Sequence, residues 1–196
     1  QEDVVAPSKQ RIVNLWEVGT WRLVGQLPPQ DTIVFSPDSR VLLGSFWQTF
    51  DLTTQKEMRP SSDENFGRGA LSPDAKRMAA IDRRGVVSFW DLRQFWNSGN
   101  RRLIDRYAAH RDRGRAIAYS PDGRMVATGS DNIIIWDAET HAKLARFAHR
   151  DLVNDLAFSP DSKRLFSAHG DGAILVWDVA EKEITKNFAS HSGVVR

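Results

Sequence analysis

Three polar residues near the C-terminal end of the chain have the residue types of a hydrolase triad. They are His149, Ser167 and Asp171. A serine that is activated by a histidine, itself oriented by an aspartate, is a nucleophile for acyl transfer. The spacing of these three residues argues against that chemistry, and we expect them to have a structural role.

Histidines could also hold a metal ion, and three of them recur along the chain. His110, His149 and His191 are separated by 39 and 42 residues, so that each would point into a different structural unit. The chain has no cysteine, which excludes disulfides and thiolate zinc sites. It also lacks the sequence patterns of phosphate loops, zincins and EF-hands. We therefore predict no catalytic residue, no cofactor and no metal site.

Composition and charge narrow the class of protein. The 196 residues include 27 basic and 25 acidic side chains, a net charge of +2, so the overall charge gives no specific sign of nucleic-acid binding. No apolar run reaches the 18 or so residues that a membrane helix needs, and the N-terminus does not resemble a signal peptide. We expect a cytoplasmic protein that does not bind membranes.

An internal repeat organises the chain. A Ser-Pro-Asp sequence occurs four times, with its serines at Ser36, Ser72, Ser120 and Ser159, which are 36, 48 and 39 residues apart. A second marker, an aromatic residue that is followed by an acidic one, runs in phase with the first. Its aromatic residues are Trp16, Phe50, Trp90, Trp136 and Trp177. Two markers with a shared period of about 40 residues indicate a repeat architecture.

The residues around each marker predict short strands and a turn. Proline favours the φ angle that begins a type I turn, and Ser or Asp can bond the turn backbone, so each Ser-Pro-Asp is expected to be a hairpin turn. The flanking runs are rich in β-branched and aromatic residues and are four to seven residues long, as is typical of strands. In the last complete unit we place four strands near 152–158, 163–168, 173–178 and 183–188.

The period, the Ser-Pro-Asp turn, the Ala-His opening and the Trp-Asp ending resemble those of WD40 repeats. The resemblance covers the chain from about residue 11 onward. It implies an all-β propeller of four-stranded antiparallel blades. It also implies a buried tetrad, in which Asp accepts from His, His meets a hydroxyl, and the hydroxyl meets the Trp indole N–H. The matching residues are His149, Ser167, Asp171 and Trp177 in the last repeat, and His110, Thr128, Asp131 and Trp136 in the one before.

Other repeats depart from this pattern. The repeat that ends at Trp90 has Ala80 and Arg84 where the family has Ser and Asp, so we predict that it lacks the tetrad. The preceding repeat has Phe50 in place of Trp. We expect the four tryptophans at 16, 90, 136 and 177 to lie in the core between blades.

The repeat boundaries predict an incomplete ring of about four full blades with a partial blade at each end. The ranges are 1–28 for a partial blade, 29–60, 61–108, 109–148 and 149–190 for full blades, and 191–196 for the start of another. Propellers close with four to eight blades, so we expect the remaining blades to lie outside this chain; the alternative is that the two partial blades join in a smaller ring.

Two features are not required by packing. The repeat that ends at Trp90 has an insertion of up to about eleven residues, in which Trp96 either packs against the blade or is an exposed anchor for a partner. Arginines also gather in loops of the type that surrounds the central channel in this family, namely Arg83, Arg84, Arg111, Arg113 and Arg150. They form either a patch for an acidic or phosphate-bearing partner or a solvated surface balanced by aspartates.

From these features we predict a non-catalytic scaffold that binds proteins or peptides. The alternative is a regulatory or sensory segment of a larger signalling enzyme, such as a bacterial Ser/Thr kinase, because many proteins of similar sequence carry such arrays beside a catalytic domain.

Overall fold

The structure is a computed structural model that describes residues 12–27, 33–36, 39–44, 49–54, 56–59, 67–98, 100–148 and 151–189. The strands of this part of the chain form one two-stranded and four four-stranded sheets, all antiparallel. We number these sheets as blades 1 to 5 in chain order. The prediction of an all-β fold built from four-stranded antiparallel blades is confirmed.

The strand bounds follow the repeats. Blade 1 pairs β1 (Val13–Trp16) with β2 (Leu23–Leu27). Blade 2 contains β3 (Ile33–Phe35), β4 (Val41–Gly44), β5 (Thr49–Asp51) and β6 (Lys56–Arg59). Blade 3 contains β7 (Arg68–Leu71), β8 (Arg77–Ile81), β9 (Val86–Asp91) and β10 (Arg102–Ala108). Blade 4 contains β11 (Ala116–Tyr119), β12 (Met125–Gly129), β13 (Asn132–Asp137) and β14 (Lys143–Ala148). Blade 5 contains β15 (Val153–Phe158), β16 (Arg164–His169), β17 (Ala173–Asp178) and β18 (Glu183–Ala189). The first and last residues of these four strands lie within one residue of the predicted positions.

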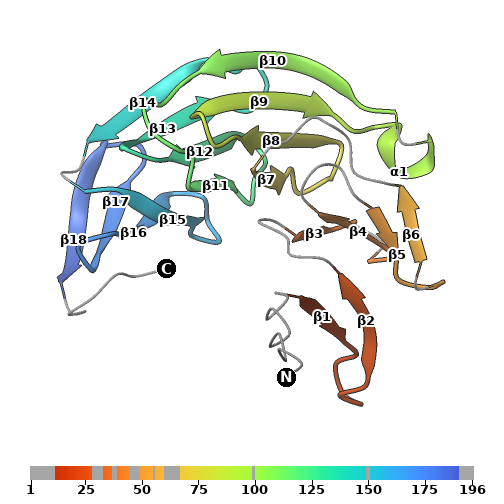
Figure 1. The fold of residues 1–196 in the computed structure, drawn as a ribbon. Helices are drawn as coiled ribbons and strands as arrows, with labels where there is room; N and C mark the ends of the chain where they lie inside the picture. The colour runs from red at the N-terminus through yellow and green to blue at the C-terminus, as the bar shows by residue number, and fades with distance from the viewer. Residues whose placement is uncertain are drawn as a thin grey trace, which may run out of the picture.

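The blades are arranged around a common centre. The first strands of successive blades, β3, β7, β11 and β15, are neighbours, and the last strand of each sheet lies at its outer edge. Figure 1 shows the blades following one another along an arc, with β10 and β14 outside and β7 and β11 inside. Over the residues that the structure describes, the arc does not close into a ring. One helical turn, α1 (Phe95–Ser98), occupies the insertion between β9 and β10.

Each Ser-Pro-Asp sequence with a described aspartate forms the predicted turn. In blade 3 the N–H of Ala75 donates to the carbonyl of Ser72 at 2.8 Å, and the Ser72 hydroxyl donates to Asp74 at 2.7 Å. The residue after the aspartate has a positive φ, 49° at Ala75 and 61° at Ser162, so the turn ends in the left-handed conformation. The hydrogen bond from Ser72 lowers the pKa of Asp74, so the carboxylate stays ionised and holds the turn.

The aspartate after each Trp or Phe closes a second turn on the same end of the strands. In blade 4 the Oδ1 atom of Asp137 accepts the N–H groups of Glu139 at 2.9 Å and Thr140 at 2.7 Å. Asp51 and Asp178 make the same pair of bonds in blades 2 and 5. The bond from the Thr140 N–H lowers the pKa of Asp137. The acidic half of the Trp-Asp marker is therefore a turn residue that lies outside the core.

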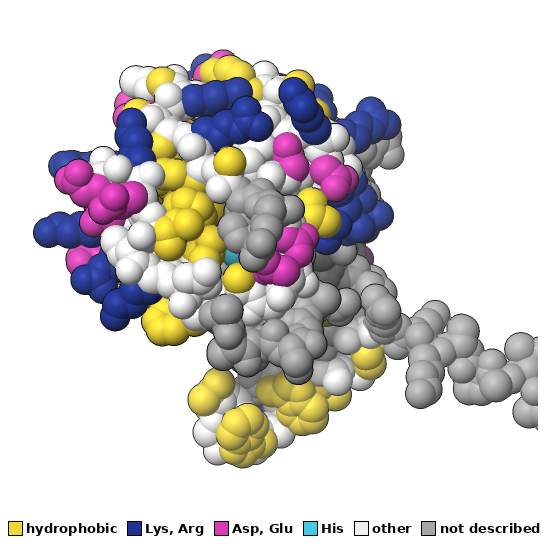
Figure 2. All heavy atoms as spheres, turned by 90° about the vertical axis from the view of Figure 1, so that its left-hand side faces the viewer, with side chains coloured by type: hydrophobic (Ala, Val, Ile, Leu, Met, Phe, Trp, Pro, Cys, Tyr) yellow, Lys and Arg dark blue, Asp and Glu magenta, His cyan; other side chains and the backbone are white. Residues whose placement is uncertain are grey.

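Both ends of the array expose large apolar side chains. In blade 1, Trp16 is 52% exposed and Trp21 is 74% exposed. In blade 5, Phe166 and Phe188 are 37% and 48% exposed. Figure 2 looks at the blade 5 end and shows hydrophobic side chains gathered on its surface, with lysines and arginines around them.

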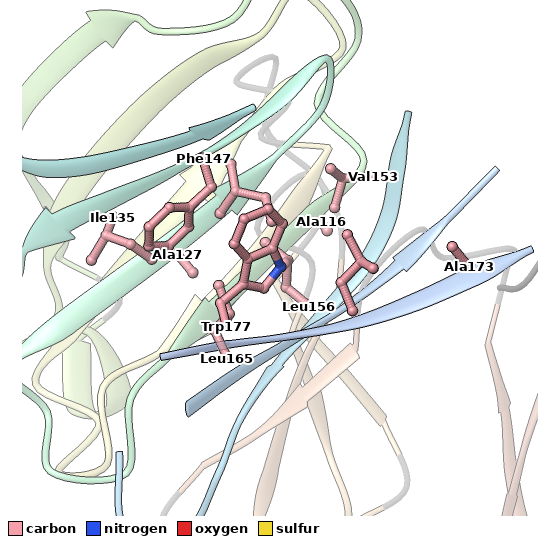
Figure 3. Close-up of a cluster of buried hydrophobic side chains, with 11 residues drawn as sticks. Ala116, Ala127, Ile135, Phe147, Val153, Leu156, Leu165, Ala173 and Trp177 are labelled. Atoms are coloured by element: carbon pink, nitrogen blue, oxygen red, sulfur yellow. The ribbon is translucent and has the colours of Figure 1, made fainter. Parts of the chain in front are cut away.

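Between the ends, the interfaces bury the aromatic side chains. The ring of Trp177 in blade 5 stacks on Phe147 of blade 4 with a centroid distance of 4.9 Å (Figure 3). Small and aliphatic residues of blade 4, Ala127 and Ile135 among them, complete that core. At the next interface, the ring centroids of Trp136 in blade 4 and Tyr107 in blade 3 are 5.4 Å apart. The Trp of each of these blades thus packs on an aromatic residue in the outer strand of the blade before it.

This rule explains where the prediction for the tryptophans was right and where it was wrong. Trp90, Trp136 and Trp177 are buried in the cores between blades, as predicted. Trp16 is exposed instead, because it belongs to the first described blade and no described residue lies where a preceding blade would cover it. Phe188 occupies the position in blade 5 that Phe147 occupies in blade 4, each opposite an isoleucine of the third strand. The two open faces are therefore equivalent to the two halves of a buried interface.

Candidate functional site

The four tetrad residues predicted in blade 4 lie together. The indole Nε1 of Trp136 donates to the Thr128 hydroxyl at 2.9 Å, and the same hydroxyl lies 2.9 Å from Nε2 of His110. Nδ1 of His110 is 3.4 Å from a carboxylate oxygen of Asp131. With its proton on Nδ1, the imidazole faces Asp131 and accepts the Thr128 hydroxyl at Nε2.

Burial determines what this network can do. Thr128 is fully buried and His110 is 7% exposed. Burial lowers the pKa of His110, so the imidazole is neutral near pH 7. A hydroxyl that already bonds a histidine and a tryptophan inside the sheet has no access to a substrate. The network instead ties the segment before β11 to β12 and β13, and so fixes the loop that His110 begins.

Blade 5 contains a related network with a histidine that sequence analysis did not select. The Trp177 indole donates to the Ser167 hydroxyl at 2.8 Å, as the resemblance implied. The imidazole at Ser167 is that of His169, with Nε2 at 2.7 Å, two residues further along β16 and fully buried. His149 lies outside the described residues. Asp171 accepts the N–H of Ala173 at 3.0 Å in the turn between β16 and β17.

Blade 3 uses a different hydroxyl. The indole of Trp90 donates to Ser88 at 3.0 Å, a residue of the same strand. Ser88 lies directly opposite Ala80 in the ladder of β8 and β9, and Ala80 occupies the place of Thr128 in blade 4. The hydroxyl has therefore moved across the ladder to the neighbouring strand, and Trp90 keeps a hydrogen-bond acceptor although the family pattern is lost.

Four of the predicted arginines lie on two segments that the fold brings together. Arg83 and Arg84 are exposed in the turn between β8 and β9, and Arg111 and Arg113 are exposed in the loop before β11. The N–H groups of Ala109 and His110 both donate to the carbonyl of Gly85, at 3.2 and 3.1 Å, and that of Gly114 donates to Asp82. We call this surface the arginine rim. Arg150, the fifth predicted residue, lies outside the described residues.

A glycine makes the close approach of these segments possible. Gly85 has a φ of 74°, and a Cβ atom there would lie 2.6 Å from the carbonyl oxygen of His110. Two aspartates stabilise the turns of the rim. Oδ1 of Asp82 accepts the N–H of Arg84 at 2.8 Å, and Oδ1 of Asp112 accepts the N–H of Arg113 at 2.6 Å. The rim is therefore a rigid surface with four exposed guanidinium groups.

Comparison with known protein families identifies the repeats. The family model described as WD domain, G-beta repeat matches residues 101–137 and 142–178. Each match begins at the outer strand of one blade and ends at the Trp-Asp of the next. These two segments of the chain are WD40 repeats.

Several WD40-repeat proteins with different names are similar to this chain. It is 25% identical to the target of rapamycin complex subunit wat1 of Schizosaccharomyces pombe over 82% of this chain and 50% of that protein. It is 29% identical to apoptotic protease-activating factor 1 of Rattus norvegicus, over 64% of this chain and 10% of that protein. It is 31% identical to the small ribosomal subunit protein RACK1 of Caenorhabditis elegans, over 50% of this chain and 31% of that protein. The chain spans half of the first relative and smaller shares of the others.

The insertion that distinguishes blade 3 from the other WD40 blades holds its aromatic residues against the sheet. Phe95 is buried, and the ring of Trp96 lies edge-on to it at 5.2 Å. The Trp96 indole donates to the carbonyl of Ala75 at 3.0 Å. This placement agrees with the packing alternative for Trp96 and leaves its indole N–H engaged within the chain.

One contact between WD40 blades was not visible in the sequence. His141, in the turn after β13, stacks on Phe89 of blade 3 at 4.2 Å, and its Nδ1 atom lies 2.5 Å from Asp105 on β10. His141 has a φ of 57°, and Lys182 has a φ of 60° at the equivalent position of blade 5. The five-residue spacing from Trp136 to His141 recurs from Trp177 to Lys182, so the sequence could indicate this turn but not the contact across the interface.

Among the described residues, no three His, Asp or Glu side chains are grouped so that they could hold a metal ion. No helix in the described part of the chain is both long and apolar enough to cross a membrane.

Proposed function

We propose that this chain is part of a WD40 scaffold that binds acidic protein or peptide partners at the arginine rim and carries out no reaction. The observation that supports it most is the rim itself. Two loops from adjacent blades are joined by backbone hydrogen bonds and present Arg83, Arg84, Arg111 and Arg113 to solvent. Guanidinium groups bind carboxylates and phosphates with two parallel hydrogen bonds, which gives such a surface both affinity and orientation.

The networks around Trp136 and Trp177 support the same proposal because their hydroxyl groups do not reach the surface. The hydroxyls of Thr128 and Ser167 are buried and bonded to tryptophans. Two of the relatives are, by their names, a subunit of a larger complex and a protein of the small ribosomal subunit. A rigid array whose loops contact partners is consistent with such roles.

Charge reversal at the rim tests the proposal. A fluorescent peptide rich in Asp and Glu should bind the chain with an affinity that falls as salt increases. The double variant Arg111→Glu, Arg113→Glu should weaken this binding at least tenfold and leave the melting temperature unchanged, because both side chains are exposed. Arg124→Glu is the control, since Arg124 is also exposed but lies at the opposite ends of the strands. Equal loss in the control and the rim variant, or no loss in either, would reject the rim as the site.

The proposal includes further WD40 blades as partners of the two open faces. Trp16 and Phe188 occupy positions that are buried between blades elsewhere in the array. Apolar faces of this kind favour association. Sedimentation velocity should therefore show self-association of the isolated chain that Phe188→Arg reduces. Association that is insensitive to both Phe188→Arg and Trp16→Arg would contradict this part of the proposal.

A further inference from the structure

The insertion of blade 3 builds a second surface that the proposed function does not use. Ten residues, 92–101, separate β9 from β10, whereas five, 138–142, separate β13 from β14. The inserted segment is fastened to the blade, since the N–H of Leu92 donates to the carbonyl of Lys76 at 2.7 Å and Trp96 bonds Ala75. The aromatic side chains pack inward, whereas Arg93, Gln94 and Asn100 are exposed on this fixed backbone.

Two adjoining hollows lie beside the insertion. One, of about 470 Å³, is lined by Asp91, Arg93, Gln94, Asn100, Arg101 and Arg102. The other, of about 500 Å³, shares Asp91, Arg93 and Arg102 and extends to Arg77 at the start of β8 and to Glu139 in the turn after β13. We call the two together the insertion hollow. Its walls come from the Ser-Pro-Asp turn of blade 3, the insertion, and the turn after β13 in blade 4, at the ends of the strands opposite to the arginine rim.

Cations outnumber anions in this hollow. Five lysine and arginine side chains line it against three carboxylates. Each of the carboxylates already has a cation beside it. Asp91 pairs with Arg93 at 2.5 Å and with Arg102 at 3.5 Å, Glu139 pairs with Arg77 at 2.5 Å, and Asp74 pairs with Lys76 at 3.7 Å. The ion pairs hold these side chains in place, and the five cations exceed the three carboxylates, so the hollow keeps an excess of positive charge.

The arginines that share Asp91 are placed to hold a second anion. Arg93 and Arg102 are 66% and 72% exposed, although both guanidinium groups lie within 3.5 Å of the same carboxylate. A guanidinium carries five N–H donors, and one carboxylate takes up only part of those of two arginines. The hydrogen bond from Arg93 lowers the pKa of Asp91 strongly, so the carboxylate stays ionised and keeps both arginines in place.

The equivalent crevice between blades 4 and 5 is different. It measures about 690 Å³, and its lining includes Met125, Leu144 and Ala145. Met125 follows its Ser-Pro-Asp serine by five residues, as Arg77 does in blade 3. The positive lining is thus a property of the crevice beside the insertion and is not repeated in the crevice between blades 4 and 5.

We propose that the insertion hollow binds a phosphoserine or phosphothreonine of a protein partner, with Arg93 and Arg102 on the phosphate. Two guanidinium groups on one side of a hollow match the several oxygens of a phosphate. Gln94 and Asn100 line the same wall, and their amides can pair with the backbone of an extended peptide. A membrane surface would require apolar side chains beside the cations, and Ile104 is the one aliphatic residue in the lining.

Fluorescence anisotropy with matched peptides tests this site. The probe is a labelled peptide library with one fixed central phosphoserine, and the comparison is the same library with serine there. We expect saturable binding of the phosphorylated library alone. The variant Arg93→Ala, Arg102→Ala should weaken it at least tenfold, and Arg93→Lys, Arg102→Lys should weaken it less because the charge remains while the paired geometry is lost. Lys163→Glu, which changes the crevice between blades 4 and 5, should have no effect.

The same experiment separates this site from the arginine rim. The double variant Arg111→Glu, Arg113→Glu should leave binding of the phosphorylated library within twofold of the unchanged chain. Equal binding of both libraries, or binding that survives both double variants of Arg93 and Arg102, would overturn the proposal. Binding only to phosphatidylcholine vesicles that contain phosphatidylinositol phosphates would overturn it in favour of a lipid. Thermal unfolding of each variant checks that any loss of binding occurs in folded protein.

Discussion

Blades 3 and 4 bury a tryptophan at the same place but satisfy its indole differently. In blade 4 the acceptor is Thr128 on the neighbouring strand, which also bonds His110 and so reaches the loop before β11. In blade 3 the acceptor is Ser88 on the same strand as Trp90. The comparison separates two requirements that coincide in the family pattern. The indole must have an acceptor when it is buried, whereas in blade 4 the further bond to His110 also holds a loop.

The largest effect is expected where one hydroxyl serves two buried partners. Thr128→Val keeps the shape of the side chain but removes the hydroxyl that the Trp136 indole and His110 both bond. We expect the free energy of unfolding to fall by about 3 kcal/mol, since each buried polar group without a partner costs about 1–3 kcal/mol. Urea denaturation measures this change. Thr53→Val, at an exposed threonine, is the control and should change stability by less than about 0.5 kcal/mol. Equal effects of the two substitutions would mean that the network does not stabilise blade 4.

Acid should weaken blade 4 through His110. Burial lowers the pKa of His110 in the folded chain, whereas the unfolded chain has an ordinary value near 6.5. As pH falls below about 6.5, the unfolded chain takes up the proton first, so the free energy of unfolding decreases with a slope of up to about 1.4 kcal/mol per pH unit for this residue. Above that pH the residue contributes no slope. Urea denaturation between pH 7.5 and 5.5 should show a smaller slope for His110→Gln than for the unchanged chain, and identical slopes would contradict the assignment.

A smaller effect is expected in blade 3, where the hydroxyl serves the indole alone. Ser88→Ala should lower the free energy of unfolding by about 1 kcal/mol, because Trp90 loses its acceptor. Adding Ala80→Ser on the opposite strand should restore part of that loss, since this position carries the acceptor in blade 4. Thermal or urea unfolding of the single and double variants checks both steps. If Ala80→Ser gives the same change with and without Ser88→Ala, the two positions do not exchange roles.

Much of the fold could be read from repeated residues because each repeat applies the same local rules. The Ser-Pro-Asp turn and the Trp-Asp turn depend on bonds within a few residues, such as those of Ser72 and Asp137. The strands between them follow from length and residue type. The rule that Trp packs on the preceding blade depends on tertiary packing, which is why the exposure of Trp16 was not predicted.

The networks within and between blades were predictable only in part. Thr128 and His110 match a pattern and lie as it implies. Ser88 and His169 are polar residues inside strands. Their local sequence does not show which side chain each of them bonds, on the same strand or on the neighbouring one. His141 reaches Asp105 across an interface, a contact that depends on how two blades are placed. The arginines could be selected as a group, but only the bonds to Gly85 show that their two loops are joined.

The packing of each tryptophan on the blade before it can be tested by a double-mutant cycle at Phe147 and Trp177. Their rings lie 4.9 Å apart with an angle of 13°, on different blades. Urea denaturation of Phe147→Leu, Trp177→Phe and the double variant gives the interaction energy between the two side chains. We predict a coupling of about 0.5–1.5 kcal/mol that favours the native pair. Additive effects, with no coupling beyond error, would contradict the arrangement of blades described above.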